Sequence, residues 1–472
     1  MENLRITNEI NAKQNPLGTE PIGRLLKRFA MPAIISLVIS ALYNIVDQIF
    51  IGHGVGILGN AATNIAFPLS TICISAALLI GIGTAANFNL EHGRGNKESA
   101  AQFAANGFLL LVIFGTVITI IASVFIKDLL ILFGSTDDIY PYAYDYVSIV
   151  NIGMPFLIFT AGASHIIRAD GSPTYSMIIM LVGAVINTIL DPIFIFVCKW
   201  GMFGAALATI IGQFVSAVIA FLYIFRFKLL KFKLSMFIPA WSKIKRIFSL
   251  GVAPAVNQAA ITIVVIALNN IMRTYGATSI YGSDIPLAVV GVVSKVNIIY
   301  IAIVVGISQG CQPIIGYNYG AKTYDRVLKT YRLAIIWTFI ISIIAFLVFQ
   351  IFPRQITSLF GSGDELYYKF ATSYFRIFMC MTWANALQPL SSGFFTSIGR
   401  TGKGVVLSLS RHIFFLLPLL LILPPYLGLD GILYSGPIAD GAAALICVIL
   451  IIGEIRKIAK QRNDFQHVLN NA

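Results

Sequence analysis

Long apolar runs recur along this chain, and they limit what it can fold into. About 20 apolar residues are needed for an α-helix to cross the hydrocarbon core of a bilayer, and twelve such runs begin near residues 29, 61, 101, 141, 174, 202, 247, 286, 330, 366, 404 and 431. Hydrophobic residues make up 57% of the 472 residues and charged residues only 11%, which is more apolar surface than one soluble core can bury. We therefore predict an all-α membrane protein with twelve transmembrane helices.

Basic residues gather in alternate connecting segments. Of the 33 Lys and Arg residues, 26 lie in the two tails and in every second loop, near residues 91–99, 168–174, 226–247, 314–332 and 399–411. By the positive-inside rule these segments face the cytoplasm, so we expect both termini there and the connector at 198–201 outside. Membrane topology thereby accounts for the net charge of +13, and we expect no nucleic-acid partner.

The second half of the chain repeats the first. The stretch GIGTAANFNLEHGRGNK from residue 81 aligns with GISQGCQPIIGYNYGAK from residue 306, and GMFG at 201 aligns with GLDG at 428. Six helices in each half bring the chain back to the same side, so the two halves enter the membrane in the same direction. A pseudo-twofold axis along the membrane normal should relate them. We predict an N-lobe with a polar N-terminal tail, a cytoplasmic basic linker and a C-lobe with a polar C-terminal tail, at residues 1–225, 226–246 and 247–472.

An aspartate interrupts the apolar run NTILDPIFIFVCKWGMFGAALATI, which starts at residue 187. Asn187 and Asp191 are four residues apart and therefore share one helical face. Asp191 and Thr209 lie nine residues on either side of a tryptophan in the connector, so a helical hairpin places them at the same depth. Asp47, near the outer end of the first helix, lies at a comparable depth. Oxygen atoms from these four residues predict a site for a hard cation such as Na+, or for a proton if the two acids repel each other.

Polar groups inside a helix bundle also have a structural interpretation. Asn187 and Thr209 alone would more often form helix-to-helix hydrogen bonds than a ligand set. Acids within the membrane, such as Asp47 and Asp191, are functional candidates by default. The two acids therefore carry the prediction of a coupling site.

Asp440, in the last predicted helix, is a candidate for a second polar site. It aligns with Gln213 in the repeat, and Lys295 and Arg376, the two basic residues inside the predicted spans, could neutralise it. A structural polar network and a second proton site both agree with this pattern.

Two prolines should bend helices. Pro32 falls past the first turn if helix one already begins in IGRLLKRFA at residues 22–30, and Pro192 leaves the carbonyl group of Thr188 without its helical donor. Helices bend where such a hydrogen bond is missing.

The chain lacks the patterns expected of an enzyme. Its five cysteines and five histidines are scattered without metal-ligand spacing, and GRTGKG at 399–404 does not match the P-loop pattern. We expect no enzymatic activity and no cofactor, and transport driven by an ion gradient.

Several stretches resemble one transporter family. YNIVDQIFIG at 43–52, NTILDPIFIF at 187–196, QGCQPIIGYNYGAK at 309–322 and GLDGILYSGPIAD at 428–440 are similar to the multidrug and toxic compound extrusion (MATE) transporters, most closely to the MepA-like bacterial branch. The resemblance covers about residues 20 to 458 and implies twelve helices in two lobes. It also implies a multi-pass antiporter in the bacterial cytoplasmic membrane, a multidrug efflux protein of the kind linked to antibiotic resistance.

The resemblance further implies a mechanism and a site. Amphipathic, often cationic compounds would be exported by alternating access in exchange for inward H+ or Na+, by a protein we expect to be a monomer. Carried over residue by residue, the N-lobe cation site of the family falls on Asp47, Asn187, Asp191 and Thr209. The acid pair that some members carry in the C-lobe is absent, because residues 257–258 and 385–388 offer amides only.

The candidates for a drug pathway follow from side-chain chemistry. Aromatic faces and methionine side chains suit amphipathic cations, and the candidates for a central cavity lie in the middle of predicted helices: Tyr43, Phe156, Tyr300, Phe378, Met381 and Trp383. The alternative function is a flippase for lipid-linked cell-wall or polysaccharide precursors. A flippase should have a more basic cavity for pyrophosphate than Lys295 and Arg376 provide.

Overall fold

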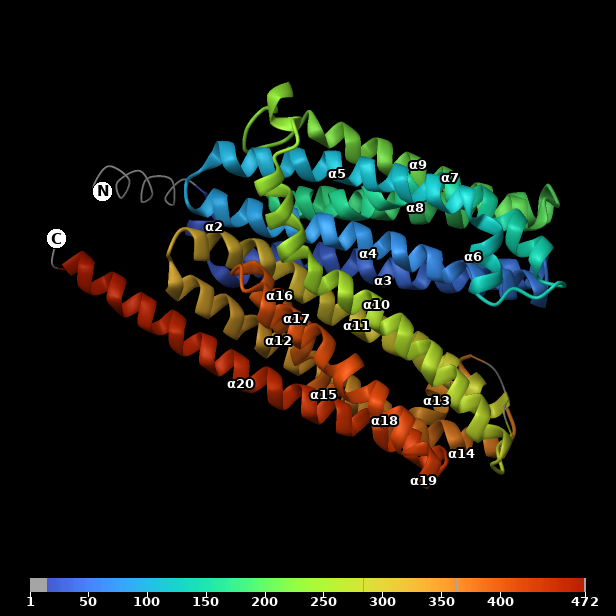
Figure 1. Cartoon of the computed structure of the whole chain (residues 1–472). Coiled ribbons are helices and arrows are strands. Elements are labelled where there is room, and N and C mark those ends of the chain that lie inside the picture. The colour runs from blue at the N-terminus through green and yellow to red at the C-terminus, as the bar shows by residue number, and fades with distance from the viewer. Residues whose placement is uncertain (1–14, 283, 361–362, 471–472) are drawn as a thin grey trace.

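The computed structural model describes residues 15–282, 284–360 and 363–470, and the regular elements within these ranges are all helical. Figure 1 shows the helices as two groups. The first half of the chain contributes six long helices and two short ones: α2 (Pro16–Thr19), α3 (Ile22–Gly54), α4 (Ile57–Gly93), α5 (Lys97–Val124), α6 (Ile126–Leu132), α7 (Tyr140–Ala169), α8 (Pro173–Pro192), extended by a π-helical turn η1 (Ile193–Val197), and α9 (Gly201–Ile224).

The second half follows a linker that contains one 3₁₀ turn, η2 (Leu234–Phe237). Its helices are less regular: α10 (Trp241–Ala277), α11 (Asp284–Gly320), α12 (Tyr324–Ile351), α13 (Pro353–Ser358), α14 (Glu365–Ser373), η3 (Tyr374–Phe378), α15 (Thr382–Asn385), α16 (Leu387–Ser397), α17 (Thr401–Leu409), η4 (Ser410–Leu416), α18 (Leu417–Ile422), α19 (Pro424–Leu427) and α20 (Leu429–Asn470).

Eleven spans among the described residues are long and apolar enough to cross a membrane. The remaining predicted span is composite, because α14, η3, α15 and α16 follow one another from Glu365 to Ser397 with short breaks. Pro389 explains the break before α16, since it cannot donate a hydrogen bond to the carbonyl group of Asn385. The prediction of twelve membrane-crossing segments in two lobes is confirmed, and the helices begin one to seven residues before the predicted apolar runs.

Both ends of the described chain lie at one end of the bundle, which we call the terminal face. Figure 1 shows α2 and the C-terminal part of α20 there, whereas the α8–α9 connector lies at the opposite end. The two groups of helices lie close together at the terminal face and spread apart toward the opposite end. Which face meets the cytoplasm stays a prediction from the charge pattern.

The two groups meet at the terminal face through direct backbone contact. A Cβ atom added to Gly251 of α10 would lie 1.6 Å from the carbonyl oxygen of Leu79 on α4, and one added to Gly83 of α4 would lie 2.0 Å from the carbonyl oxygen of Ile247. Only glycine permits so close an approach of two helices. Helix α3 packs in the same manner on α11, where a Cβ on Gly310 would lie 2.5 Å from the Cα atom of Ala30.

Two helices exchange partners near this face. Leu25, Leu26 and Phe29 of α3 pack in one cluster with Ile314 and Tyr331 of the second half. Ile244 and Ile247 of α10, conversely, pack in the core of the first half. The proposed lobe boundaries in the sequence therefore remain a prediction, and packing at the terminal face crosses them in both directions.

Candidate functional site

The residues of the predicted cation site come together inside the first half. Asn187 and Asp191 lie on the same face in the last two turns of α8, and both are buried, at 2% and 0% exposure. The Asn187 Nδ2 atom donates to Asp191 Oδ1 at 3.3 Å and to Thr209 Oγ1 of α9 at 3.2 Å. Thr209 Oγ1 in turn donates to the carbonyl oxygen of Ala205 at 3.0 Å. The α8–α9 hairpin thus brings Asn187 and Asp191 beside Thr209, as the connector length indicated.

Helix α3 adds the second acid. α3 packs against α8, and the carboxyl group of Asp47 lies next to that of Asp191. Two neighbouring carboxyl groups in a low-dielectric site cannot both carry an uncompensated charge cheaply. A proton or a metal cation would relieve the repulsion.

Three oxygen atoms of this site have no hydrogen-bond partner. They are Oδ1 of Asp47, Oδ1 of Asn187 and Oδ2 of Asp191, and each of the three atoms is shielded from solvent. Buried oxygen atoms without a donor are costly, so these atoms mark a place where a cation or a proton would gain three acceptors. Carboxylate, amide and hydroxyl oxygens suit a hard cation such as Na+. The described residues contain no cluster of three or more His, Cys, Asp or Glu side chains that could hold a metal ion, so a metal at this site would depend on its neutral ligands.

Two tyrosines complete the surroundings of the site. Tyr43 lies one turn before Asp47 on α3, and its hydroxyl group lies beside Thr209. Tyr146 of α7 reaches the same threonine and is 9% exposed. Tyr43 is a predicted drug-cavity residue that lies instead at the cation site, and Tyr146 is a site residue that the sequence does not predict. A tyrosine in the middle of an apolar helix was the available signal, because a buried hydroxyl group usually needs a polar partner.

The candidate second polar site is organised differently from the prediction. Asp440 of α20 is 3% exposed, and its Oδ1 atom accepts a hydrogen bond from Arg411 Nε at 2.5 Å. Arg411 lies in the π-helical segment η4, although the charge count had assigned it to a loop. Lys295 has no hydrogen bond or ion pair with Asp440 among the described residues, and Gln213 lies beside Gly153 in the first half. Arg411 is therefore the partner of Asp440.

The C-lobe amides noted in the sequence do meet. Gln388 Nε2 donates to the carbonyl oxygen of Leu407 at 2.9 Å and to Asn257 Oδ1 at 3.4 Å. A neutral amide contact thus occupies a region where some relatives were expected to carry an acid pair.

The aromatic candidates for a drug cavity are dispersed. Tyr300 is buried in the core of the second half, and its hydroxyl group donates to Ser342 Oγ and to the carbonyl oxygen of Thr382, both at 2.9 Å. Phe378 belongs to the same core and stacks on Tyr374. The others lie apart from them, with Phe156 against Phe214 and Trp383 against Phe339, while Met381 is half-buried. Their role in substrate binding stays a prediction.

Arg168 is a buried cation that the charge count had also assigned to a loop. It lies in the last turn of α7 at 4% exposure, and its Nη1 atom donates to Gln309 Oε1 of α11 at 2.6 Å. Its Nη2 atom reaches Ser176 Oγ at 3.4 Å, and its Nε atom has no acceptor. No carboxylate among the described residues pairs with it. Arg168 thus joins the two halves through neutral partners only.

The MatE family profile matches this chain over residues 32–193 and 259–422. An FAD transporter of Shewanella oneidensis is 24% identical over 91% of this chain and 94% of its own length. The multidrug export protein MepA of Staphylococcus haemolyticus is 23% identical over 91% and 93%. A multidrug resistance MATE family transporter solved in an outward-facing conformation superposes with a TM-score of 0.87 at 24% identity, covering 95% of this chain and 98% of that structure. The profile match spans most of both lobes, and the chain belongs to the MATE family of multi-pass membrane transporters, which are not enzymes.

Proposed function

We propose that this protein is a secondary active exporter of amphipathic, often cationic small molecules, driven by inward flow of H+ or Na+. Asp47 and Asp191 carry the proposal, because they place two carboxyl groups side by side with three unpartnered oxygen atoms in a buried site. A cation or proton that enters this site changes its charge. Such a ligand shifts a conformational equilibrium by its difference in affinity for the two states.

The conformational change we propose is alternating access. The described arrangement is closed at the terminal face, where α4 meets α10 and α3 meets α11. Opening that face requires Gly251 and Gly83 to leave their backbone contacts. The acid pair would bias this equilibrium through α3, because α3 carries Asp47 and also packs on α11.

Transport in proteoliposomes tests this proposal directly. A Na+ gradient and a pH gradient are imposed in separate experiments on the purified protein. One of them should drive ethidium movement, and that gradient identifies the coupling ion. Asp191→Asn keeps the side-chain shape and removes the charge, so gradient-driven transport should be lost while the protein stays folded. Thr209→Ala removes one neutral ligand and should weaken the dependence on the cation without abolishing transport. Near-normal gradient-driven transport by Asp191→Asn would reject the coupling role, and movement of a fluorescent lipid without ethidium transport would favour a flippase.

A flavin nucleotide is the second candidate substrate. The Shewanella relative is named an FAD transporter, and Arg168 provides a guanidinium group without a carboxylate partner at the contact between the two halves. A phosphate group is a natural partner for such a cation. The same proteoliposomes should then transport FAD. Loss of FAD transport in Arg168→Gln, with ethidium transport by that variant unchanged, would support this candidate. Lack of FAD transport by the wild-type protein would reject it.

A further inference from the structure

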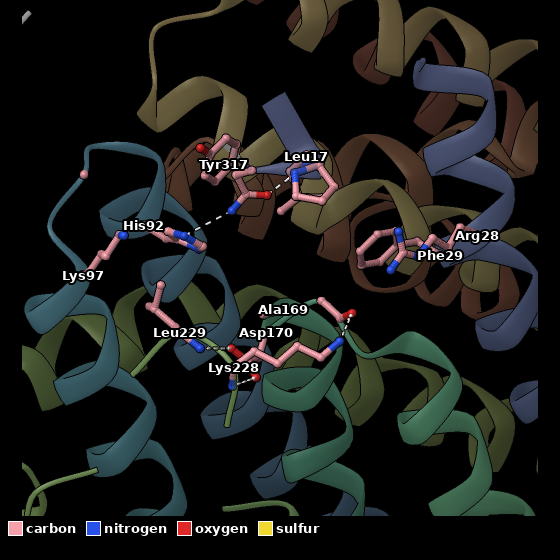
Figure 2. A pocket seen from close by; sticks show the side chains of 14 residues that line it. Leu17, Arg28, Phe29, His92, Lys97, Ala169, Asp170, Lys228, Leu229 and Tyr317 are labelled. Carbon is pink, nitrogen blue, oxygen red and sulfur yellow. Dashed lines mark hydrogen bonds between the residues drawn. The ribbon is translucent and has the colours of Figure 1, made fainter. Parts of the chain in front are cut away.

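A cavity of about 350 Å³ opens at the terminal face. Figure 2 shows side chains from separate parts of the chain around it. They come from the N-terminal segment at Asn15, from α3 at Arg28, from the start of α5 at Lys97, from the α7–α8 turn at Asp170 and from the linker at Lys228. Its volume falls at the lower end of the range for small-molecule sites.

The cavity is positively charged. Lys97 has no hydrogen-bond acceptor and no carboxylate partner among the described residues. The Lys228 Nζ atom donates only to the carbonyl oxygen of Gly171, at 3.0 Å. Arg28 has one ion pair, with Glu20 at 3.5 Å, and both side chains of that pair are partly exposed. Three cations therefore line the space, and neither lysine forms an ion pair among the described residues.

The one carboxylate among the described lining residues, Asp170, offsets only part of this charge. Asp170 accepts hydrogen bonds from the backbone N–H groups of Lys228 at 2.7 Å and Leu229 at 3.1 Å, and from the Tyr223 hydroxyl group at 2.8 Å. Its oxygen atoms are therefore engaged in fixing the linker to the α7–α8 turn. The ammonium groups of Lys97 and Lys228 stay available to a ligand.

We propose that this cavity binds a phosphate-bearing ligand, either a soluble phosphate ester or the headgroup of an anionic phospholipid. A phosphate group offers several acceptor oxygens and more than one negative charge to the ammonium groups. Asn15 and His92 add polar groups at the rim, where Asn15 Nδ2 and His92 Nε2 are hydrogen-bonded at 3.2 Å. Phe29 and Tyr317 add aromatic surface for the organic part of the ligand.

The ligand would bridge the two halves of the protein. The segment that contains Asn15 is held on the second half, because Leu17 O accepts hydrogen bonds from Asn318 Nδ2 at 2.9 Å and Arg326 Nη2 at 3.0 Å. Lys97, which also lines the cavity, begins α5 of the first half. An anion between them would stabilise the arrangement closed at the terminal face, since it binds that arrangement better than one in which the halves have separated.

Binding to the purified full-length protein tests the proposal with two kinds of probe. The soluble probes are inorganic phosphate and AMP, titrated by calorimetry at low ionic strength. The lipid probe is a nanodisc containing phosphatidylglycerol, compared with one of phosphatidylcholine, with the melting temperature as readout. The test variant is the double substitution Lys97→Gln and Lys228→Gln. The control is Lys231→Gln with Lys233→Gln, two exposed linker lysines that do not line the cavity.

We expect saturable binding of AMP or phosphate, or selective stabilisation by phosphatidylglycerol. The binding should weaken about 25-fold in the cavity variant, because each lysine near a phosphate surface is worth about five-fold. The control variant should keep the wild-type affinity. A response to the soluble probes alone identifies a free phosphate ester, and a response to the lipid alone identifies a headgroup. Equal affinity and equal lipid stabilisation in the cavity variant and the control variant would overturn the proposal. So would the lack of a saturable response of the wild type to any probe.

Discussion

The glycine contact between α4 and α10 makes a quantitative prediction. In Gly251→Ala the new methyl group would start 1.6 Å from the carbonyl oxygen of Leu79, whereas real Cβ contacts essentially never fall below 3.0 Å. The carbonyl oxygen belongs to the backbone and cannot move aside as a flexible side chain could. Helices α4 and α10 must therefore move apart by more than an ångström. Overpacking of this kind typically costs about 2 kcal/mol. That cost falls on the arrangement closed at the terminal face, and it should shift the equilibrium between closed and open arrangements by about 30-fold.

Spin labels can measure this shift. Glu98→Cys on α5 and Lys329→Cys on α12 are exposed positions near the terminal face, one in each half, and they can be labelled on a background without native cysteines. Double electron–electron resonance should show a longer-distance population in Gly251→Ala that is minor in the parent. Gly291→Ala is the matched control, because a Cβ at this helical glycine on α11 would meet nothing within 4 Å.

Combining two substitutions separates backbone contact from local helix effects. Gly83→Ala strains the same crossing from the other helix, so the double variant with Gly251→Ala should cost less than the two single costs added together. Additive effects would mean that the glycines act independently. A parental distance distribution and parental transport rate in Gly251→Ala would refute the proposed closure of this face by backbone contact.

Three further predictions concern charge. Asp440→Asn should destabilise the protein by about 3 kcal/mol, because Arg411, whose side chain is only 12% exposed, then loses its carboxylate. Thermal unfolding in detergent measures the loss, and a change in coupling ion at unaltered stability would contradict this structural role. Burial raises the pKa of Asp170 to about 6 against the lowering effect of its hydrogen bonds. The contribution of Asp170 to stability is therefore fully present below pH 4 and is lost as the pH rises through 6. A scan of melting temperature from pH 4 to 8 should show a steeper decline for the wild type than for Asp170→Asn, and parallel curves would contradict this pH dependence. Lys199→Cys should react with an impermeant thiol reagent in intact cells, and Lys231→Cys only after permeabilisation, with the reverse pattern showing that the terminal face lies outside.

Local spacing predicted the arrangement of Asn187, Asp191 and Thr209, because the helical repeat and the length of the connector fix which side chains share a depth. Asp47 could be added because its distance from the end of helix one was readable in the sequence. Arg168 and Arg411 were misplaced, because counting charges near the ends of apolar runs does not distinguish a loop arginine from one in the last turn of a helix or within a π-helical segment. The partner of Asp440 was unpredictable for the same reason.

Contacts between the two halves were harder to predict from the sequence than the cation site. Gly83 and Gly251 look like many other glycines in membrane helices, and nothing local shows that each meets a backbone carbonyl group of the opposing helix. The cavity at the terminal face is lined by six separate stretches of the chain, so its charge could not be predicted from the pattern of any one of them. Tyr146 was missed because apolar helices carry many aromatic residues, and only the three-dimensional arrangement brings one of them to Thr209.

The exchange of packing partners by α3 and α10 has a consequence for how the chain is made. Leu25, Leu26 and Phe29 are synthesised early, but the residues that bury them, including Ile314 and Tyr331, follow only after the linker. A ribosome that has released the first six helices into the membrane has therefore not supplied all the partners of α3. Cutting the gene at the linker should yield two fragments that each lack part of their packing. Neither fragment should accumulate alone, whereas coexpression of both lets α3 and α10 find their partners in trans.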